Sequence, residues 1–251
     1  MPQAGHSSPP NPSVGIPYPH LGQLLFTLLR VACEHLMFEL SFFCLLFLAL
    51  TLVGEGLDKP RLRLVSKPLA SLAFVGAGLS LNMTAEPYGV ALLLALLFSL
   101  AGDVFLLPKG SKLFFLVGLG SFLLAHIAFV ACFLLTGEMQ WGRAAIVSVP
   151  SVALAVGIAR WLLPSVSQPM KKPVLAYIAV ITAMVTLAWS CDVGWLAPVA
   201  ATLFFCSDIS VAVDRFRSGG FLNRLWGLPA YYVAQLLFVL WFSGFSAAVN
   251  P

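Results

Sequence analysis

The chain has 251 residues, of which 60% are hydrophobic and only 10% are charged, and its mean hydropathy is +0.95. Soluble domains carry about 45–50% apolar and about 25% charged residues, so this composition excludes a water-soluble globule or a disordered chain and predicts a polytopic membrane protein. A formal net charge of +4 is too small for a nucleic-acid binder, and no nucleic-acid partner is expected.

The chain opens with a polar tail and a short apolar segment. Residues 1–20 are rich in Pro, Ser and Gly and lack the basic start of a signal peptide, so they predict a disordered tail. Residues 21–33 are apolar and either lie at the membrane interface or begin the first helix. Residues 21–251 are expected to form a single transmembrane bundle.

Eight longer apolar stretches follow, each able to cross about 30 Å of hydrocarbon as a helix. They show no strand-like alternation, and only helices and closed barrels cross a bilayer. The predicted fold class is therefore an all-α polytopic membrane protein with eight transmembrane helices. The predicted spans are 36–54, 63–81, 88–107, 113–135, 144–163, 173–190, 195–213 and 228–248.

The basic residues are sorted between the two sides of these spans. Only Arg30 and Arg143 lie on one side. By the positive-inside rule the other side is cytoplasmic, so both termini are expected on the non-cytoplasmic side of a bacterial inner membrane or the endoplasmic reticulum. The twelve residues on the predicted cytoplasmic side are Lys59, Arg61, Arg63, Lys67, Lys109, Lys112, Arg160, Lys171, Lys172, Arg215, Arg217 and Arg224.

Two pairs of residues suggest an internal duplication. Lys67 and Asp103 are 36 positions apart, and so are Lys172 and Asp208. Each Lys precedes a Pro, and each Asp follows a small residue near the end of an apolar span. Because four helices separate the two copies, both halves would enter the membrane in the same sense, as a parallel repeat about an axis along the membrane normal.

A third match extends this repeat. Residues 121–130 resemble residues 230–239, at an offset four positions longer than that of the first two pairs. The repeat halves are expected at about 36–135 and 144–248. The alternative is chance similarity between helices that are all rich in Leu, Phe and Ala.

Polar side chains inside the spans gather at one depth. Such groups are costly in lipid and usually face the bundle interior. Counting from the predicted helix ends places seven of them near the cytoplasmic face, with His126 slightly deeper. If the repeat holds, Asp103 and Asp208 are equivalent about its axis and can point into one cavity. The seven are Lys67, Asp103, Tyr177, Asp208, Tyr231, Tyr232 and Gln235.

Each of these residues has a structural alternative. Asp103 could simply form an ion pair with Lys67, and Asp208 could hydrogen-bond to a neighbouring helix. Asp214, with Arg215 and Arg217, is expected to form a solvated face. The remaining histidines lie outside this level, so no multi-histidine metal site is predicted. The five scattered cysteines predict free, buried thiols.

Five segments carry a family resemblance. In consistent order over about residues 60–245, they resemble the YhhN-like lysoplasmalogenase family. Arg215 stands at a position where Lys is also familiar in that family. The segments are Lys67-Pro68, SLAGDVFL at 99–106, GSFLLAH at 120–126, SDISVAVDRF at 207–216 and YYVAQ at 231–235.

The resemblance implies a membrane hydrolase that cleaves the vinyl ether bond of lysoplasmalogens. The products would be a long-chain aldehyde and glycerophosphoethanolamine or glycerophosphocholine, and the expected partners are a lysophospholipid substrate and membrane lipids. Vinyl ether hydrolysis needs a proton donor and a negative charge near an oxocarbenium ion, which two carboxylates can supply without a metal or redox cofactor.

The predicted catalytic residues are accordingly Asp103 and Asp208, as acid and base in undetermined order. The other polar residues at this level are predicted to bind substrate, orient water or bias which Asp ionises. They are Lys67, His126, Tyr177, Tyr231, Tyr232 and Gln235.

Two other functional classes stay open. A small-solute or lipid transporter would suit a parallel repeat; Pro150 and Pro198 favour it, whereas Pro68 and Pro173 lie near span starts, where Pro is tolerated. A non-catalytic lipid-binding or scaffold protein is the second alternative, although the shortage of soluble loops argues against protein docking. The sequence is compatible with a homo-oligomer.

Overall fold

The computed structural model describes residues 19–108 and 110–249, so residues 1–18 of the predicted tail lie outside the described part. The described residues form eight α-helices and two short 3-10 helices, without a β-strand. These are α1 (Pro19–Gly56), α2 (Pro60–Leu79), η1 (Met83–Ala85), α3 (Pro87–Phe105), α4 (Lys112–Thr136), α5 (Trp141–Leu162), η2 (Leu163–Ser165), α6 (Gln168–Ser190), α7 (Leu196–Phe216) and α8 (Phe221–Val249).

All eight α-helices are long and apolar enough to cross a membrane, which confirms the predicted all-α fold with eight spans. The largest difference from the predicted bounds is α1. It begins at Pro19, so it takes in the apolar segment 21–33 and two residues assigned to the tail. That segment begins the first helix because no proline interrupts residues 20–59.

Local sequence sets where several helices begin. Pro60 and Pro87 stand in the first turns of α2 and α3, where the missing N–H of proline costs nothing. The hydroxyl of Ser111 caps α4 by accepting the backbone N–H of Phe114 at 3.4 Å. Between α2 and α3, Asn82 adopts the left-handed region with φ of 52°, which Asn tolerates. The resulting short turns make successive helices antiparallel neighbours.

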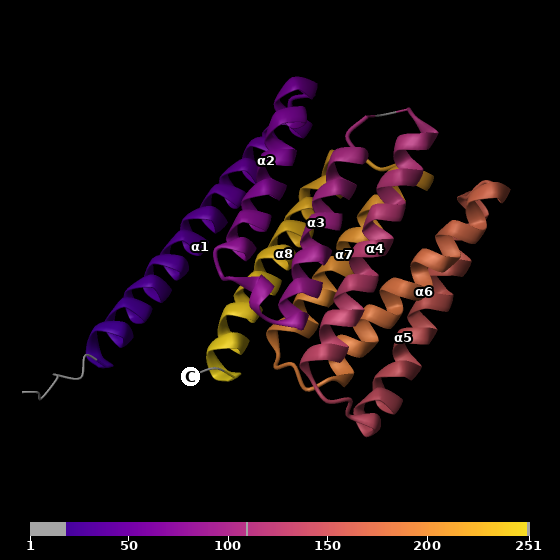
Figure 1. Cartoon of the computed structure of the whole chain (residues 1–251). Coiled ribbons are helices and arrows are strands. Elements are labelled where there is room, and N and C mark those ends of the chain that lie inside the picture. Colours follow the sequence, from indigo (N-terminus) through magenta and orange to yellow (C-terminus); the bar gives the residue numbers. More distant parts are fainter. Residues whose placement is uncertain (1–18, 109, 250–251) are drawn as a thin grey trace, which may run out of the picture.

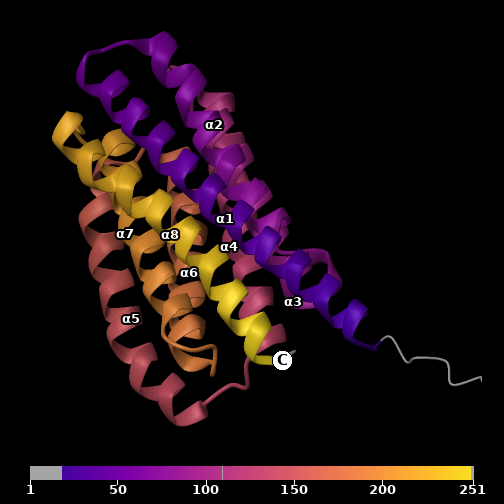
Figure 2. The same ribbon diagram turned by 90° about the vertical axis from the view of Figure 1, so that its left-hand side faces the viewer.

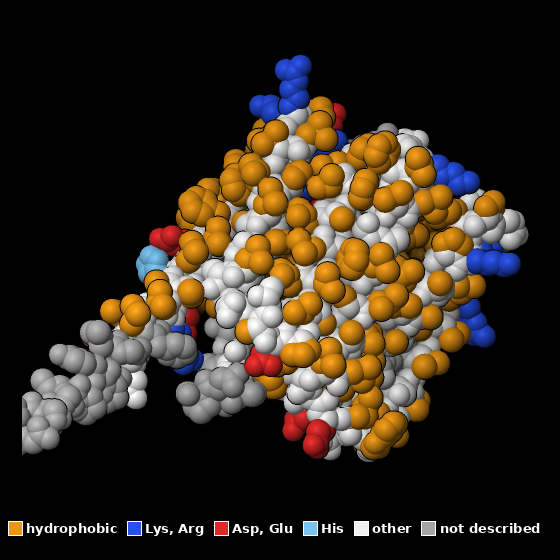
Figure 3. All heavy atoms as spheres, in the orientation of Figure 1, with side chains coloured by type: hydrophobic (Ala, Val, Ile, Leu, Met, Phe, Trp, Pro, Cys, Tyr) orange, Lys and Arg blue, Asp and Glu red, His pale blue; other side chains and the backbone are white. Residues whose placement is uncertain are grey.

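The helices alternate in direction, so the turns after α1, α3, α5 and α7 gather at one end of the bundle (Figure 1). These turns and the adjoining helix ends carry most of the Lys and Arg residues, and we call this end the basic end. Figure 3 shows apolar side chains covering the surface between the two ends. The chain is therefore a multi-pass membrane protein, and the side that its basic end faces stays a prediction.

The order of the helices in space differs from their order in the chain. α3, α4, α7 and α8 form the centre, with α1 and α2 on one flank and α5 and α6 on the other (Figures 1 and 2). α3 packs chiefly on α4, and α7 on α8, while α2 also contacts α8 and α6 contacts α4. The second helix of each predicted half thus meets the last helix of the other half. This agrees with a parallel repeat, which itself stays a prediction.

The centre of the bundle is packed with aromatic side chains. The ring centroids of Phe129 and Phe238 lie 4.1 Å apart and join α4 to α8. Gly102 lets α3 approach α4, because a Cβ at this position would lie 2.5 Å from the ring of Phe122. Gly102 directly precedes Asp103. The contact of Gly102 with α4 therefore fixes the position from which the Asp103 side chain projects. All five cysteines are free, as predicted, but only Cys44, Cys132 and Cys191 are buried, whereas Cys33 and Cys206 are partly exposed.

Candidate functional site

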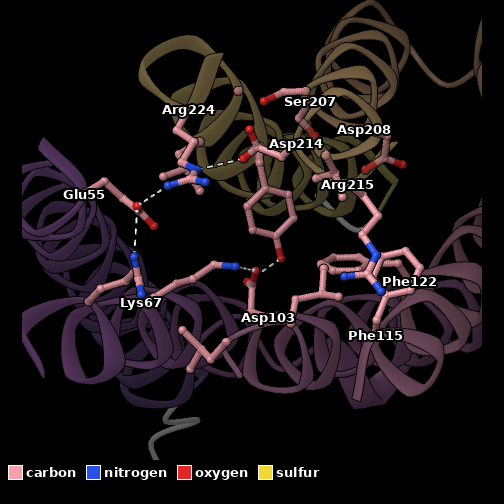
Figure 4. Close-up of a pocket in the computed structure, with 18 of the residues that line it drawn as sticks. Glu55, Lys67, Asp103, Phe115, Phe122, Ser207, Asp208, Asp214, Arg215 and Arg224 are labelled. Carbon is pink, nitrogen blue, oxygen red and sulfur yellow. Dashed lines mark hydrogen bonds and ion pairs between the residues drawn. The ribbon is translucent and has the colours of Figure 1, made fainter. Parts of the chain in front are cut away.

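A cavity of about 270 Å³ lies near the basic end and is lined mainly by α7 and α8, with further residues from α1, α2, α3, α4 and the turn between α3 and α4 (Figure 4). Charged residues make up eight of the twenty that line it. Ionisable groups are costly at membrane depth and are a mark of functional sites there. The eight are Glu55, Arg63, Lys67, Asp103, Asp208, Asp214, Arg215 and Arg224.

Asp103 on α3 is held by three donors from α2 and α8. Nζ of Lys67 lies 2.9 Å from its Oδ1. The hydroxyls of Ser71 and Tyr231 donate to its Oδ2 at 2.6 and 2.7 Å. The side chain is only 2% exposed, so these contacts supply the countercharge and hydrogen bonds that a buried carboxylate requires. The Lys67–Asp103 ion pair considered for the sequence is therefore present, and it lies on the cavity wall.

Asp208 on α7 has a different set of partners. The hydroxyl of Tyr177 on α6 donates to its Oδ2 at 2.7 Å, and Nε2 of His126 on α4 lies 3.4 Å from the same oxygen. Within the described part of the chain, neither Lys nor Arg forms an ion pair with it, and Oδ1 accepts no hydrogen bond. One oxygen of Asp208 is thus tethered, and the other is available to the cavity.

The contacts of His126 indicate its tautomer. Its Nδ1 lies 2.6 Å from the carbonyl oxygen of Phe122. Because a carbonyl can only accept, Nδ1 carries a proton, and in the neutral ring Nε2 is a bare lone pair. Nε2 lies 3.4 Å from Oδ2 of Asp208 but has no hydrogen-bond partner among the described residues. The two groups are therefore close neighbours that no hydrogen bond joins.

The structure brings most of the predicted site residues together. Lys67, Asp103, Asp208 and Tyr231 line the cavity. Tyr177 and His126 reach it through their contacts with Asp208. The two aspartates stand on facing walls, one on α3 and the other on α7 (Figure 4).

Tyr232 and Gln235 lie behind the wall of the cavity. The hydroxyl of Tyr232 donates to the backbone oxygen of Lys67 at 3.1 Å and lies 3.2 Å from Oγ of Ser71. It therefore supports two of the residues that hold Asp103. Gln235 is fully buried, and both of its amide atoms lack a hydrogen-bond partner among the described residues.

An ionic network at the basic end of the cavity was not selected from the sequence. Oε2 of Glu55 accepts hydrogen bonds from Arg63 at 3.0 Å and from Arg224 at 2.6 Å. Nε of Arg224 also donates to Asp214 at 2.8 Å. Glu55, near the end of α1, thereby ties α2 to α8, and Arg224 ties α8 to α7. The position of Glu55 at the end of an apolar span indicates from sequence that it has a basic partner. Which residue that partner is depends on the packing of segments that are distant in the chain.

The prediction that Asp214, Arg215 and Arg217 form a solvated face holds only in part, because Arg215 and Arg217 are exposed but Asp214 is half-buried. Its side chain is 24% exposed, lines the cavity, and accepts a second hydrogen bond from Nδ2 of Asn223 at 2.9 Å. The guanidinium of Arg215 instead stacks on Phe115, with 3.9 Å between its carbon and the ring centroid. Arg215 also lines the cavity and makes no ion pair with an acid in the described residues.

The arrangement suits acid–base chemistry beside an anionic group. It combines a carboxylate paired with Lys67, a second carboxyl group next to an imidazole, and the stacked guanidinium of Arg215. Within residues 19–108 and 110–249, no three His, Cys, Asp or Glu side chains are grouped so that they could hold a metal ion.

Comparison with known proteins identifies a matching family and several related proteins. The model of the YhhN family matches residues 62–242. Proteins named lysoplasmalogenase from Mycobacterium bovis and Mycobacterium tuberculosis are 32% identical over 151 residues, which is 57% of this chain and 56% of each relative. The mouse protein lysoplasmalogenase TMEM86B is 32% identical over 160 residues, covering 62% of this chain and 63% of its own length. No solved structure matches the chain significantly.

Proposed function

The chain belongs to the YhhN family, and from this premise we propose that it is a membrane hydrolase that cleaves the vinyl ether bond of lysoplasmalogens. The products are a long-chain aldehyde and glycerophosphoethanolamine or glycerophosphocholine. The names of the mycobacterial and mouse relatives support the activity. The observation that carries the proposal is that two carboxyl groups with different partners line one cavity within the membrane.

Vinyl ether hydrolysis proceeds in three steps. A proton adds to the β-carbon of the C=C–O unit, and the α-carbon becomes an oxocarbenium ion. Water attacks that carbon and loses a proton, giving a hemiacetal. The hemiacetal then breaks its C–O bond to the glycerol, releasing the aldehyde and the alcohol. The enzyme must therefore supply a proton, stabilise a cation and accept a proton from water.

Asp208 is the proton donor in this proposal. Its carboxyl group is taken to be protonated before the reaction, since it has no ion pair with Lys or Arg in the described residues, and Nε2 of His126 lies 3.4 Å from its Oδ2. Tyr177 holds that oxygen at 2.7 Å, which leaves Oδ1 to meet the β-carbon of the substrate. After the transfer Asp208 is an ionised carboxylate, and the proton that the attacking water releases must reach it before the next cycle.

Asp103 supplies the negative charge. With Lys67 at 2.9 Å and two hydroxyl donors, it remains an anion on the wall that faces Asp208. A fixed carboxylate stabilises the developing oxocarbenium ion electrostatically, as paired carboxylates do in glycoside hydrolysis. The Tyr231 hydroxyl, 2.7 Å from Asp103, is placed to bind the attacking water and to pass its proton toward the carboxylate.

The positively charged side chains that line the cavity are suited to bind the phosphate of the lysolipid headgroup. Arg215 carries a charge that no acid of the described residues neutralises, and its side chain is fixed by stacking on Phe115. A lysolipid carries its phosphate a few bonds from the ether, so Arg215 is the residue expected to contact the phosphate, with Arg224 behind it.

The test compares a lysoplasmalogen with its saturated ether analogue, using purified protein in detergent or liposomes. Only the vinyl ether should be consumed, with one aldehyde released for each glycerophospholipid. Asp103→Asn and Asp208→Asn should each lower the rate by about 10²–10⁴-fold while the protein still unfolds cooperatively. Full rates in both variants would exclude the carboxylate mechanism, and solute flux or lipid movement without turnover would favour a transporter instead.

A further inference from the structure

A second, smaller cavity of about 70 Å³ adjoins the first. It lies among α4, α5, α6 and α7, and we call it the apolar groove. Aliphatic and aromatic side chains form its wall, including Leu119 of α4, Ile158 of α5 and Ile178 of α6. The polar residues in its lining are Tyr177, Asp208 and Arg215. The groove is therefore apolar except at the point where it reaches the proposed proton donor.

The groove and the charged cavity share one wall. Six residues line both: Leu106, Phe115, Phe122, Asp208, Val211 and Arg215. Asp103, Lys67 and the ionic network of Glu55 line only the charged cavity. A molecule that occupied both spaces would thus place its polar part among Lys67, Asp103 and Arg215 and would pass Asp208 at the junction.

We propose that the apolar groove binds the first carbons of the single hydrocarbon chain of a lysolipid, next to the ether bond. This inference rests on the proposed function and deepens it, because it places the vinyl ether against Asp208 rather than Asp103. The headgroup lies in the charged cavity and the chain leaves through the groove, so the bond between them sits at the shared wall. The groove is too small for a second chain, which suits a lysolipid.

Only the beginning of the chain fits a space of about 70 Å³, so the rest extends into the bilayer. α5 packs along α6 rather than α4, and both α4 and α5 contribute residues to the groove. The chain therefore exits between α4 and α5. Because the chain comes from lipid and not from water, the hydrophobic effect adds little to binding. The groove acts instead by orientation, holding the β-carbon beside the acid.

A photoreactive lipid tests the site without requiring turnover. The probe is a saturated ether lysolipid, which cannot be hydrolysed by vinyl ether chemistry, with a diazirine on the chain close to the ether. After illumination, mass spectrometry of the purified full-length protein identifies the labelled residues. Labels should concentrate on groove residues of α4, α6 and α7. Labels confined to α1 or to the outer, lipid-facing surfaces of the bundle would overturn the proposal.

A matched pair of substitutions sharpens the test. Ala212 lines the groove, whereas Ala176 on α6 is exposed on its outer face. Ala212→Phe should reduce labelling of the groove about tenfold, and Ala176→Phe should leave it within about twofold, because a side chain of this size blocks a small pocket. Ile178→Trp narrows the groove from α6 and repeats the test if Ala212→Phe does not fold. Undiminished groove labelling in the folded variants would also overturn the proposal.

Turnover measured beside labelling separates the two proposals. If wild-type protein labels in the groove but does not consume lysoplasmalogen, the hydrolase assignment fails and the chain site stands. If it consumes lysoplasmalogen but labels elsewhere, the chain site fails and the hydrolase stands. For a groove that orients the substrate, Ala212→Phe should lower turnover of long-chain lysoplasmalogen, while Ala176→Phe retains it.

Discussion

At the scale of single residues, Asp103 and Asp208 show how one side-chain type acquires two different environments. A buried carboxylate is stable only when a countercharge and hydrogen bonds replace its hydration. Asp103 has both, from Lys67 and two hydroxyls. Asp208 has Tyr177 and an imidazole nitrogen but no ion pair with Lys or Arg in the described residues. The difference arises from the neighbouring helices, α2 and α8 in one case and α4 and α6 in the other.

The Lys67–Asp103 pair should be essential for stability as well as for chemistry. Lys67→Met leaves the carboxylate, which is 2% exposed, without its cation. Breaking a buried pair in this way costs about 3–5 kcal/mol, so the thermal unfolding midpoint of purified protein should fall markedly. We expect turnover to fall with it, because Asp103 is then no longer held as an anion.

The double variant Lys67→Met/Asp103→Asn separates stability from activity. It removes both charges, so it should recover much of the lost thermal stability, since an unpaired charge is what destabilises the single variant. Activity should not return. A double variant as unstable as the sum of its single variants would show that the two charges do not depend on each other.

The hydroxyl of Tyr177 should position the proposed acid. Tyr177→Phe removes its 2.7 Å hydrogen bond to Asp208 and keeps the ring that packs against His126. We expect about tenfold lower turnover, from a looser carboxyl group, with the fold retained. Tyr88→Phe is the matched control, because this buried tyrosine begins α3, roughly 22 Å along the helix from Asp103. Equal turnover in both variants would remove Tyr177 from the mechanism.

At the scale of helices, Glu55 joins three elements. It accepts from Arg63 on α2 and Arg224 on α8, and its side chain is 9% exposed. Glu55→Ala leaves two arginines without this partner, one of them partly exposed, and should destabilise the protein by about 3 kcal/mol. For a chain of this size that is a fall of roughly 6–12 °C in the unfolding midpoint.

An exposed ion pair on α1 provides the control for Glu55. Arg30 and Glu34 are 43% and 42% exposed and lie one turn apart on the same helix. Exposed pairs of this kind contribute about 0–1 kcal/mol, so Glu34→Ala should shift the midpoint by little. If Glu34→Ala and Glu55→Ala have the same effect, the network at the basic end does not hold α1, α2 and α8 together.

The contrast between these two ion pairs also shows what sequence could predict. Arg30 and Glu34 are four positions apart in one helix, so their contact follows from helical periodicity. Glu55 and Arg224 are 169 positions apart, and their contact exists only because α1 and α8 are neighbours in the bundle. The same reason explains why the Lys67–Asp103 pair, which lies on consecutive spans at one depth, could be considered from the sequence as an alternative, whereas the partners of Asp214 could not.

At the scale of the whole molecule, length and hydropathy were sufficient for the fold class. Eight apolar runs predicted eight helices because a bilayer of fixed thickness demands spans of fixed length. Depth along each span then predicted which polar residues share a level, and Lys67, Asp103, Asp208 and Tyr231 do line one cavity. The depth of a residue in the membrane does not show in which direction its side chain projects around the helix axis. That is why Tyr232 and Gln235, at the predicted level, lie outside the cavity lining.

The distribution of charge over the whole molecule predicts its orientation. The turns at the basic end should face the cytoplasm, because positively charged loops are retained there during insertion. Two single cysteines test this with a membrane-impermeant maleimide. Ser218→Cys lies in the exposed turn between α7 and α8 at the basic end. Asp192→Cys lies between α6 and α7 at the opposite end, where the native side chain is 67% exposed.

In intact cells or sealed right-side-out vesicles, the reagent should label Asp192→Cys at once and Ser218→Cys only after the membrane is permeabilised. The wild-type protein gives the background, which should be low near Asp192: Cys191 is 2% exposed, and burial raises the pKa of its thiol, so little reactive thiolate is present at neutral pH. The opposite labelling order would place the charged cavity at the non-cytoplasmic leaflet. The headgroup of the proposed lysolipid substrate would then have to enter from that leaflet, although the geometry of Asp103 and Asp208 would be unchanged.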